Sequence, residues 1–219
     1  MSSPRPLLAV TLAAALGAVS TASHAALTAF TTSASFAVAT LASATDAFNL
    51  LPIDFIASPS NRTIGPYSYV ASAPGGLFGA GSAANPWLST NLSGATLTFG
   101  SFGGGVSAIG GSFFGSDIAG GFLAGQSLTL TATDSVGASL TQTINGATQT
   151  SFLGFASTGT LVSLAVSIAS PNAFAAVDNL VLAQAAPIPE PETYAMLLAG
   201  LATLATIGRR RRGRHVWPC

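Results

Sequence analysis

A strict alternation of polar and apolar side chains runs through Ser127-Leu128-Thr129-Leu130-Thr131-Ala132-Thr133. Successive side chains of an extended strand point to opposite faces, so this spacing places the apolar residues on one face and the hydroxyls on the other. The next residues, Asp134-Ser135-Val136-Gly137, have the composition of a turn, and residues 138–144 resume the alternation. The pattern predicts a half-buried β-hairpin, followed by a second tight reversal at Asn145-Gly146.

Short β-prone segments of the same kind occur on both sides of this hairpin, separated by turn-forming residues. They cover residues 95–99, 106–114, 151–156, 161–168 and 173–182. Many short strands at a spacing of roughly ten residues are typical of antiparallel sandwiches, whereas βαβ folds alternate strands with long helical segments. The sequence therefore predicts a mainly β chain that folds as an antiparallel β-sandwich.

The region before these segments is less regular. Residues 33–44 contain no Gly or Pro and space their larger side chains at helical intervals, which predicts a short helix before a first strand at residues 51–56. Between residues 58 and 86 the density of Pro and Gly rises. We expect long loops there, with an edge strand at residues 67–70.

The first 25 residues have the organisation of an export signal. Arg5 precedes an apolar core at residues 7–19, and the small residues Ser23-His24-Ala25 follow it. A core of about thirteen residues is short for spanning a bilayer of ~30 Å, so a cleaved signal helix is expected rather than an anchor. Signal peptidase is the implied partner, and Ala22 and Ala26 are alternative positions for the cut.

The other end of the chain combines an apolar run, residues 193–208, with Arg209, Arg210, Arg211 and Arg212. Arginines that directly follow an apolar helix resist translocation and remain on the cytoplasmic side. The run therefore predicts a C-terminal transmembrane helix with the preceding domain outside the cytoplasm. Residues 213–219 form a short tail that ends in Cys219, which is the chain's lone cysteine, so an intrachain disulfide is excluded.

The middle of the chain, residues 26–186, is nearly free of charge. One basic residue, Arg62, stands against five aspartates, which gives a net charge of −4, and the segment contains no Lys, Glu, His, Cys or Met. Nucleic-acid binding requires clustered Lys and Arg, so it is excluded as the function of this domain. Its length fits one exported domain.

The segment that begins at Pro189, Glu190 and Pro191, continues through the apolar run and ends in the four arginines closely resembles the PEP-CTERM sorting signal of Gram-negative bacteria. We assign residues 187–212 to this signal. The resemblance implies processing by an exosortase, a membrane protease, and places the protein transiently in the inner membrane and then in the cell envelope or outside the cell. It also implies a role in exopolysaccharide or biofilm systems.

A second resemblance concerns the domain itself. Ser151-Phe152-Leu153-Gly154-Phe155 and, one strand later, Ala175-Ala176-Val177-Asp178-Asn179-Leu180 are similar to the closing strands of jelly-roll ectodomains. Such sandwiches resemble carbohydrate-binding modules and lectin-like domains. The resemblance implies a jelly-roll-like shape and suggests a polysaccharide as ligand, although one fold serves many functions.

Catalytic chemistry has little support in the residues. Both histidines, His24 and His215, lie outside residues 26–186, so Ser-His-Asp, Cys-His and ordinary zinc sites are excluded there. The residues call for no cofactor, and calcium is the ion that the Asp and Asn oxygens could hold. The candidate ligands are Asp178 and Asn179 together with Asp54 or Asp117.

Three aromatic residues in the segment with many Pro and Gly, Tyr67, Tyr69 and Trp87, are candidates for stacking against sugar rings. The sequence thus favours a non-enzymatic, exported envelope or matrix protein that is adhesive or sugar-binding. The alternatives are a carboxylate-dependent glycan hydrolase or lyase, and a purely structural domain without a ligand.

Overall fold

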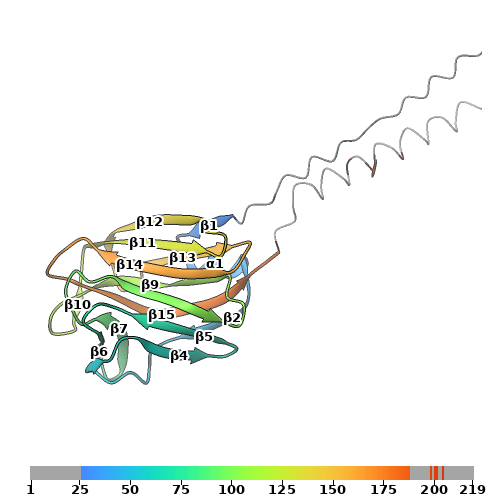
Figure 1. The fold of residues 1–219 in the computed structure, drawn as a ribbon. Helices are drawn as coiled ribbons and strands as arrows, with labels where there is room; N and C mark the ends of the chain where they lie inside the picture. Colours follow the sequence, from blue (N-terminus) through green and yellow to red (C-terminus); the bar gives the residue numbers. More distant parts are fainter. Residues whose placement is uncertain (1–25, 188–197, 199, 202–203, 205–219) are drawn as a thin grey trace, which may run out of the picture.

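Two antiparallel sheets pack face to face in the computed structural model, which describes residues 26–187 together with 198, 200, 201 and 204 (Figure 1). Within residues 26–187 the larger sheet has nine strands, which are, in order, β1 (Leu27–Phe30), β13 (Phe152–Ser157), β9 (Ala108–Ser116), β15 (Phe174–Ala185), β7 (Asn85–Thr90), β6 (Leu77–Ser82) and β3 (Phe55–Ile56), with β10 (Phe122–Leu123) beside β9 and β2 (Thr40–Asp46) beside β15. The smaller sheet, over the same residues, has six strands in the order β12 (Ser139–Ala147), β11 (Gln126–Asp134), β14 (Leu161–Ile168), β8 (Leu97–Gly103), β5 (Tyr67–Ser72) and β4 (Ser60–Ile64).

The β11–β12 hairpin follows from the alternation in its sequence. Leu128, Leu130 and Ala132 are fully buried between the sheets. On the outer face, the hydroxyls of Thr131 and Thr141 lie 2.9 Å apart across the two strands, and other Thr and Ser pairs of the hairpin repeat this contact. Cross-strand pairs of this kind each stabilise a sheet by roughly 0.2–1 kcal/mol. The hairpin is confirmed. The prediction that its apolar side chains face the core and its hydroxyls face outward is confirmed as well.

Large apolar side chains from both sheets fill the space between them. The fully buried residues include Phe113 and Phe155 from the larger sheet and Phe99 and Leu164 from the smaller one. Burying a side chain of this size contributes about 1.5–3 kcal/mol. The core is therefore continuous from one sheet to the other, and it lies away from the outer faces.

Strand β15 changes its partner halfway along its length. Ala176 and Val177 pair with β7, whereas the stretch from Leu180 onward pairs with β2. At the change, the two residues after Asp178 lie opposite one residue of β9, which is a β-bulge. Asn179 sits in this bulge with φ of +50°, a conformation that Asn tolerates better than most residues.

An ion pair links the two sheets close to this bulge. Arg62 of β4 donates from Nε to Asp46 Oδ2 at 2.6 Å and from Nη2 to Asp46 Oδ1 at 2.8 Å, while Tyr69 of β5 donates to Asp46 Oδ2 at 2.8 Å. The guanidinium also lies 5.0 Å from the ring centre of Phe48. Because Asp46 belongs to β2 and pairs with Leu180 of β15, these contacts hold the two sheets together.

The carboxylate of this pair is charged in the folded domain. Burial alone would raise the pKa of Asp46, but the hydrogen bonds from Arg62 and Tyr69 and the charge of Arg62 hold the pKa below its ordinary value of 3.8. A carboxyl group with a depressed pKa stabilises the fold above its unfolded pKa, and this stability is lost as the pH falls through the folded pKa.

Several expectations for residues 26–94 were wrong. Helix α1 (Ser33–Val38) is capped by Thr32 and ends early, because residues 40–46 form β2 along the free edge of β15. Only Phe55 and Ile56 of the expected first strand are paired. Residues 58–86 form strands rather than long loops, since glycines such as Gly65 serve tight turns with positive φ.

The structure differs from the sequence-based expectations in two further places, at a predicted edge strand and at a predicted turn. Strand β5 lies between β4 and β8, so it is not an edge strand. Asn145 and Gly146 do not reverse the chain but form a bulge inside β12, opposite Ser127. Gly146 takes a positive φ there, which explains why its sequence resembles that of a turn.

The antiparallel sandwich is confirmed, whereas its jelly-roll-like strand arrangement stays a prediction. The predicted signal helix at residues 1–25 and most of the predicted transmembrane helix lie outside the described residues. Within the described part of the chain, no helix has the length and apolar character that a membrane crossing needs.

Replacing Arg62 by Met should lower the free energy of unfolding at pH 7 by about 3 kcal/mol, because Asp46 would remain buried without its cationic partner. The loss should shrink as the pH falls, because burial without the cation raises the pKa of Asp46 and the carboxyl group of the variant becomes protonated. Urea unfolding at several pH values measures both effects. The exposed Asp54→Asn change is the matched control and should alter stability by less than about 0.5 kcal/mol. Equal loss at pH 7 and pH 3 would contradict the electrostatic explanation.

Candidate functional site

A small pocket of about 160 Å³ opens on the outer face of the nine-stranded sheet. The orientation of β9 shows which face this is. A side chain at Gly115 would touch Gln126 and Ile168 of the six-stranded sheet, so Phe114 and Ser116 point outward. The residues around the pocket come from β6, β7, β9, β15 and the β9–β10 turn, and they are Phe78, Ala80, Ser89, Thr90, Asn91, Ser116, Asp117, Ile118, Gly120 and Phe174.

Strand register brings two phenyl rings and two hydroxyls together in this pocket. Phe78 of β6 lies opposite Ser89 of β7, and Phe174 of β15 lies opposite Ser116 of β9. The hydroxyls of Ser89 and Ser116 are 2.9 Å apart and buried. The pocket therefore has a hydroxyl pair at its base with a phenyl ring from β6 and another from β15.

The turn between β9 and β10 forms one wall of the pocket. Asp117 Oδ1 accepts hydrogen bonds from the backbone N–H groups of Ala119 at 2.9 Å and Gly121 at 2.8 Å. The carbonyl of Gly120 accepts from Gly81 of β6 at 2.9 Å, which fixes the turn against the sheet. Among the described residues, Asp117 Oδ2 has no hydrogen-bond partner, so one carboxylate oxygen is left for a ligand.

A cluster of aromatic side chains supports the pocket from the neighbouring positions of the same face. The ring of Trp87 meets that of Phe114 edge to face at 5.3 Å, and Phe114 meets Phe122 at 5.8 Å. Trp87 is 5% exposed, and within the described residues its Nε1 donates no hydrogen bond. The prediction that Trp87 stacks on sugar was wrong, because its side chain is buried in the hydrophobic core.

The two tyrosines predicted to stack on sugars are also buried. Tyr67 and Tyr69 are each 1% exposed. Tyr67 donates its hydroxyl hydrogen bond to the carbonyl of Ala42, and Tyr69 belongs to the ion-pair network of Asp46 and Arg62. Their sequence neighbourhood suggested loops, but both side chains point inward from β5. The sugar-stacking prediction for them was therefore wrong.

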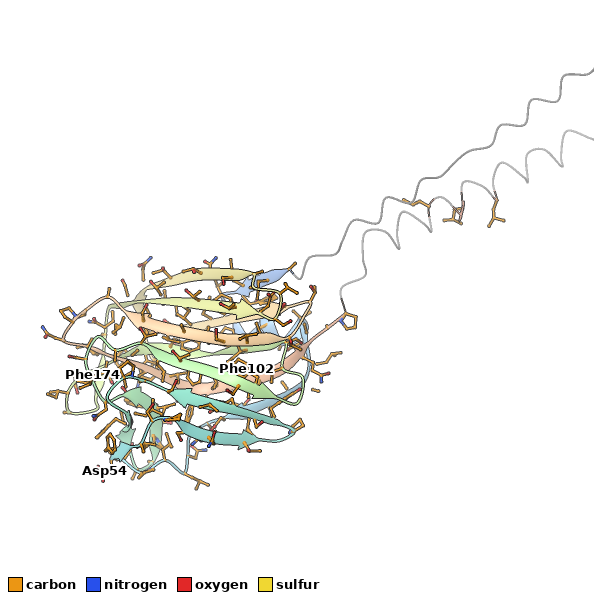
Figure 2. The ribbon with its side chains drawn as sticks, in the orientation of Figure 1. Asp54, Phe102 and Phe174 are labelled. Carbon is orange, nitrogen blue, oxygen red and sulfur yellow. The ribbon has the colours of Figure 1, made fainter. Side chains whose placement is uncertain are left out.

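The predicted calcium ligands do not assemble into one site. Asp178 lies opposite Ser112 on β9, and Asp117 follows that residue by five positions, which is about 17 Å along a strand. Asp54 is exposed near the same end of the domain as Phe174, and its carboxylate accepts the N–H of the neighbouring Phe55 (Figure 2). No group of three or more His, Cys, Asp or Glu side chains forms among the described residues.

Asp178 and Asn179 instead have a structural place in the β15 bulge. Asp178 is 8% exposed, and its Oδ1 accepts the N–H of Asn179 at 2.7 Å. Burial raises the pKa of Asp178 above its ordinary value, and the hydrogen bond from Asn179 only partly offsets this. A carboxyl group with a raised pKa is best accommodated when it is protonated.

The pocket residues can form hydrogen bonds with a ligand and stack against its apolar faces. Ser89 and Ser116 have no imidazole beside them, because residues 26–187 contain no histidine. Sequence reasoning did not find this site. The sequence around Phe174 suggests a core position. No short sequence motif marks Phe78, Ser89, Asn91 or Ser116 as site residues, since only the pairing of distant strands brings them together.

Comparison with protein families identifies the C-terminal segment. A model described as the PEP-CTERM protein-sorting motif matches residues 187–212. The chain carries a PEP-CTERM sorting motif. The motif implies export and processing at a membrane, in agreement with the predicted boundaries. The motif residues Pro189, Glu190 and Pro191 and the four arginines from Arg209 to Arg212 lie outside the described residues.

Comparison with curated proteins gave no match. Among solved structures, TmCBM61 in complex with β-1,4-galactotriose is similar, with 11% sequence identity, a TM-score of 0.29, and coverage of 53% of this chain and 88% of that one. A score this low does not establish a shared fold, and it says nothing about what this chain binds.

Replacing Asp178 by Asn should raise the thermal unfolding midpoint at pH 7. The folded pKa of Asp178 lies above the unfolded one, so its contribution to stability is present below the unfolded pKa and is lost as the pH rises through the folded pKa. The amide side chain of the variant would keep an oxygen for the bulge without the buried charge. The two proteins should unfold at the same temperature near pH 3. A lower midpoint for the variant at pH 7 would mean that the charge is needed.

Proposed function

We propose that this protein is an exported, non-enzymatic carbohydrate-binding protein of the cell envelope or extracellular matrix, with its binding site in the pocket between β6, β7, β9 and β15. The observation that carries this proposal is the combination of the Phe78 and Phe174 rings with the Ser89–Ser116 hydroxyl pair and the unpaired oxygen of Asp117. Sugars present apolar C–H faces and hydroxyl edges, and a pocket of this composition suits both.

The volume of the pocket limits the size of the ligand that it can hold. Pockets for drug-sized molecules measure about 300–1,000 Å³, so a volume of about 160 Å³ suits a single sugar residue. The wall residues are neutral apart from Asp117, which favours neutral sugars, because a uronic acid would meet a carboxylate. The ligand we propose is the end or one exposed residue of a neutral polysaccharide.

An enzyme is the rival function. Glycan hydrolases generally use two carboxyl groups that flank the scissile bond, at about 5–10 Å from each other. Asp117 is the one carboxylate among the pocket residues, and Asp178 is about 17 Å away along the strand direction. The pocket therefore favours binding over turnover. A purely structural domain without a ligand remains the second alternative and predicts no glycan binding at all.

The sorting motif supplies the second half of the proposed function. The apolar run at residues 193–208 would anchor the exported domain in the inner membrane, and an exosortase would then release or transfer it. Alternating prolines favour extended backbone, so Pro187 to Pro191 would present an accessible segment to that protease. Signal peptidase would act earlier, after residue 25.

Changing Phe174 to Ala should weaken binding of the best ligand from a neutral-glycan array by about fivefold, because one aromatic contact contributes roughly 1 kcal/mol. Phe78→Ala should act similarly. The matched control is Phe102→Ala, a half-buried phenylalanine of β8 in the other sheet (Figure 2). Titration calorimetry gives the affinities. Binding that survives both pocket variants would place the site elsewhere, and turnover lost in Asp117→Asn would favour the enzyme.

Replacing Pro189, Glu190 and Pro191 by alanines should leave the domain folded but retained, uncleaved, in the inner membrane. A chain that ends after Ala186 should be exported as a soluble domain with unchanged thermal stability, since the hydrogen bond from Ala186 N–H to the Ala39 carbonyl is kept. Fractionation, intact mass and circular dichroism test both. Processing of the alanine variant at the normal rate would contradict the role of the motif.

A further inference from the structure

The outer strands of the larger sheet are poor templates for a further strand. An edge strand presents unpaired backbone N–H and C=O groups, and natural domains shield such edges by short strands, charges, prolines or bulges. As far as the structure describes the larger sheet, β1 has four residues, and β3 and β10 have two each. Strand β2 is irregular at Ala42, where φ is +49° and the carbonyl accepts a hydrogen bond from Tyr67.

The two edges of the smaller sheet differ from each other. Strand β4 has five residues, follows Pro59 and carries Arg62. Strand β12 has nine residues and contains neither a charged residue nor a proline. Its bulge lies near its end, so residues 139–144 are regular strand, and within residues 26–187 the backbone of 139–146 bonds to β11 alone. Figure 1 shows β12 at the rim of the domain, where it is the one long unshielded edge among the described strands.

The sequence of this edge is nearly the same when it is read in either direction. Residues 139–145 are Ser-Leu-Thr-Gln-Thr-Ile-Asn, and similar residues stand at equal distances from the central glutamine. Antiparallel pairing of two copies about this glutamine places Thr141 opposite Thr143 and Leu140 opposite Ile144. Thr–Thr pairs with hydroxyls 2.9 Å and 3.2 Å apart already join β11 to β12. The edge is therefore complementary to a second copy of itself, as a two-fold interface requires.

The inward-facing residues of β12 are incompletely covered. Leu140 and Ile144 are half-buried, whereas Ala132 and Leu128, which lie opposite them on β11, are fully buried. A strand beside β12 would cover the remaining exposed part of the two side chains. Gln142 lies between them and is exposed, and within the described residues its amide makes no hydrogen bond. A primary amide both donates and accepts, so it can pair with the same amide of a second copy.

No charge opposes the approach of two copies at this edge. The groove beside residues 142–144, of about 470 Å³, is lined by hydroxyl, amide and apolar side chains, and neither it nor β12 contains a charged residue. Asp134, which precedes the hairpin turn, is only 2% exposed. Identical surfaces bring like charges face to face across a two-fold axis. A neutral edge is therefore the place where a domain with a net charge of −4 can meet its own copy at the lowest electrostatic cost.

We propose that this protein forms a two-fold symmetric dimer in which β12 of one copy pairs antiparallel with β12 of the other, centred on Gln142. The two six-stranded sheets then become one continuous sheet of twelve strands, and the open edge is removed. This inference goes beyond the proposed function and does not depend on it. A dimer carries two copies of the candidate pocket, so a polysaccharide that bound there would be held at two points, which raises the overall affinity.

Cysteine crosslinking of the full chain tests the register, with Cys219→Ser removing the lone cysteine. In Gln142→Cys the two Cα atoms would lie about 4.5–5.5 Å apart, within the range that a disulfide spans. We expect mild oxidation to convert most of this variant into a covalent dimer. The matched control is Ser139→Cys, which is exposed on the same strand. In the proposed register its two copies would be about 20 Å apart and should not crosslink.

Charge substitutions at Gln142 test the dimer itself. Gln142→Lys should raise the dissociation constant of the dimer by at least about tenfold, because like charges then meet at the two-fold axis, and Gln142→Glu should do the same. An equimolar mixture of the two variants should dimerise again, because opposite charges then meet. Sedimentation velocity of the full chain in detergent micelles measures the masses. Thr63→Lys, at an exposed position of β4, is the matched control and should leave the dimer unchanged.

Three results would overturn the proposal. The first is a monomeric wild-type chain at every concentration tested. The second is a dimer that persists in both charge variants or crosslinks equally at positions 139 and 142, because the copies would then associate elsewhere or in another register. The third is a mixture of the two charge variants that stays monomeric although circular dichroism shows both to be folded. None of these results bears on glycan binding by the pocket, which the Phe174→Ala variant tests.

Discussion

The ion pair between Arg62 and Asp46 is the contact on which the arrangement of the two sheets depends. Arg62 is the one basic residue between positions 26 and 186, and it makes a bidentate contact inside the domain rather than serving solubility. Asp46 belongs to the larger sheet, whereas Arg62 and Tyr69 are paired neighbours in the smaller one. A buried charge without its partner is strongly unfavourable, so these strands must meet in one register.

This constraint acts where the larger sheet is most irregular. Strand β15 exchanges β7 for β2 at the bulge of Asp178 and Asn179, and Asp46 pairs with Leu180 directly after it. A bulge bends the strand and increases its local twist. The ion pair fixes β2 at this bend, and β2 in turn covers the edge of β15 up to Ala185. The last strand therefore ends at a defined place, where Ala185 pairs with Thr40 of β2.

Local patterns in the sequence predicted the half of the fold that is made of regular hairpins. Alternation in residues 127–144 determines which face is buried, because that property belongs to each strand alone. The same reasoning failed for Tyr67 and Tyr69, since the nearby prolines and glycines mark tight turns between strands whose pairing depends on distant partners. The candidate site could not be predicted from the sequence either. Its residues are distant in the chain and become neighbours only through the strand order β9-β15-β7-β6. The sorting motif is defined by consecutive residues of one short segment. It could therefore be identified at residues 187–212 without knowledge of the fold.

Strand β9 runs between the two ends of the domain. Its first residue, Ala108, pairs with Ala183 near the end of β15, and its last, Ser116, lines the pocket between β6, β7, β9 and β15. They are eight residue steps apart, or about 27 Å along the strand. The pocket therefore lies at the end of the domain opposite to the end of β15, after which the sorting motif begins. The antiparallel sandwich produces this separation by itself, because it places strand ends, and with them the connecting turns, at two opposite rims.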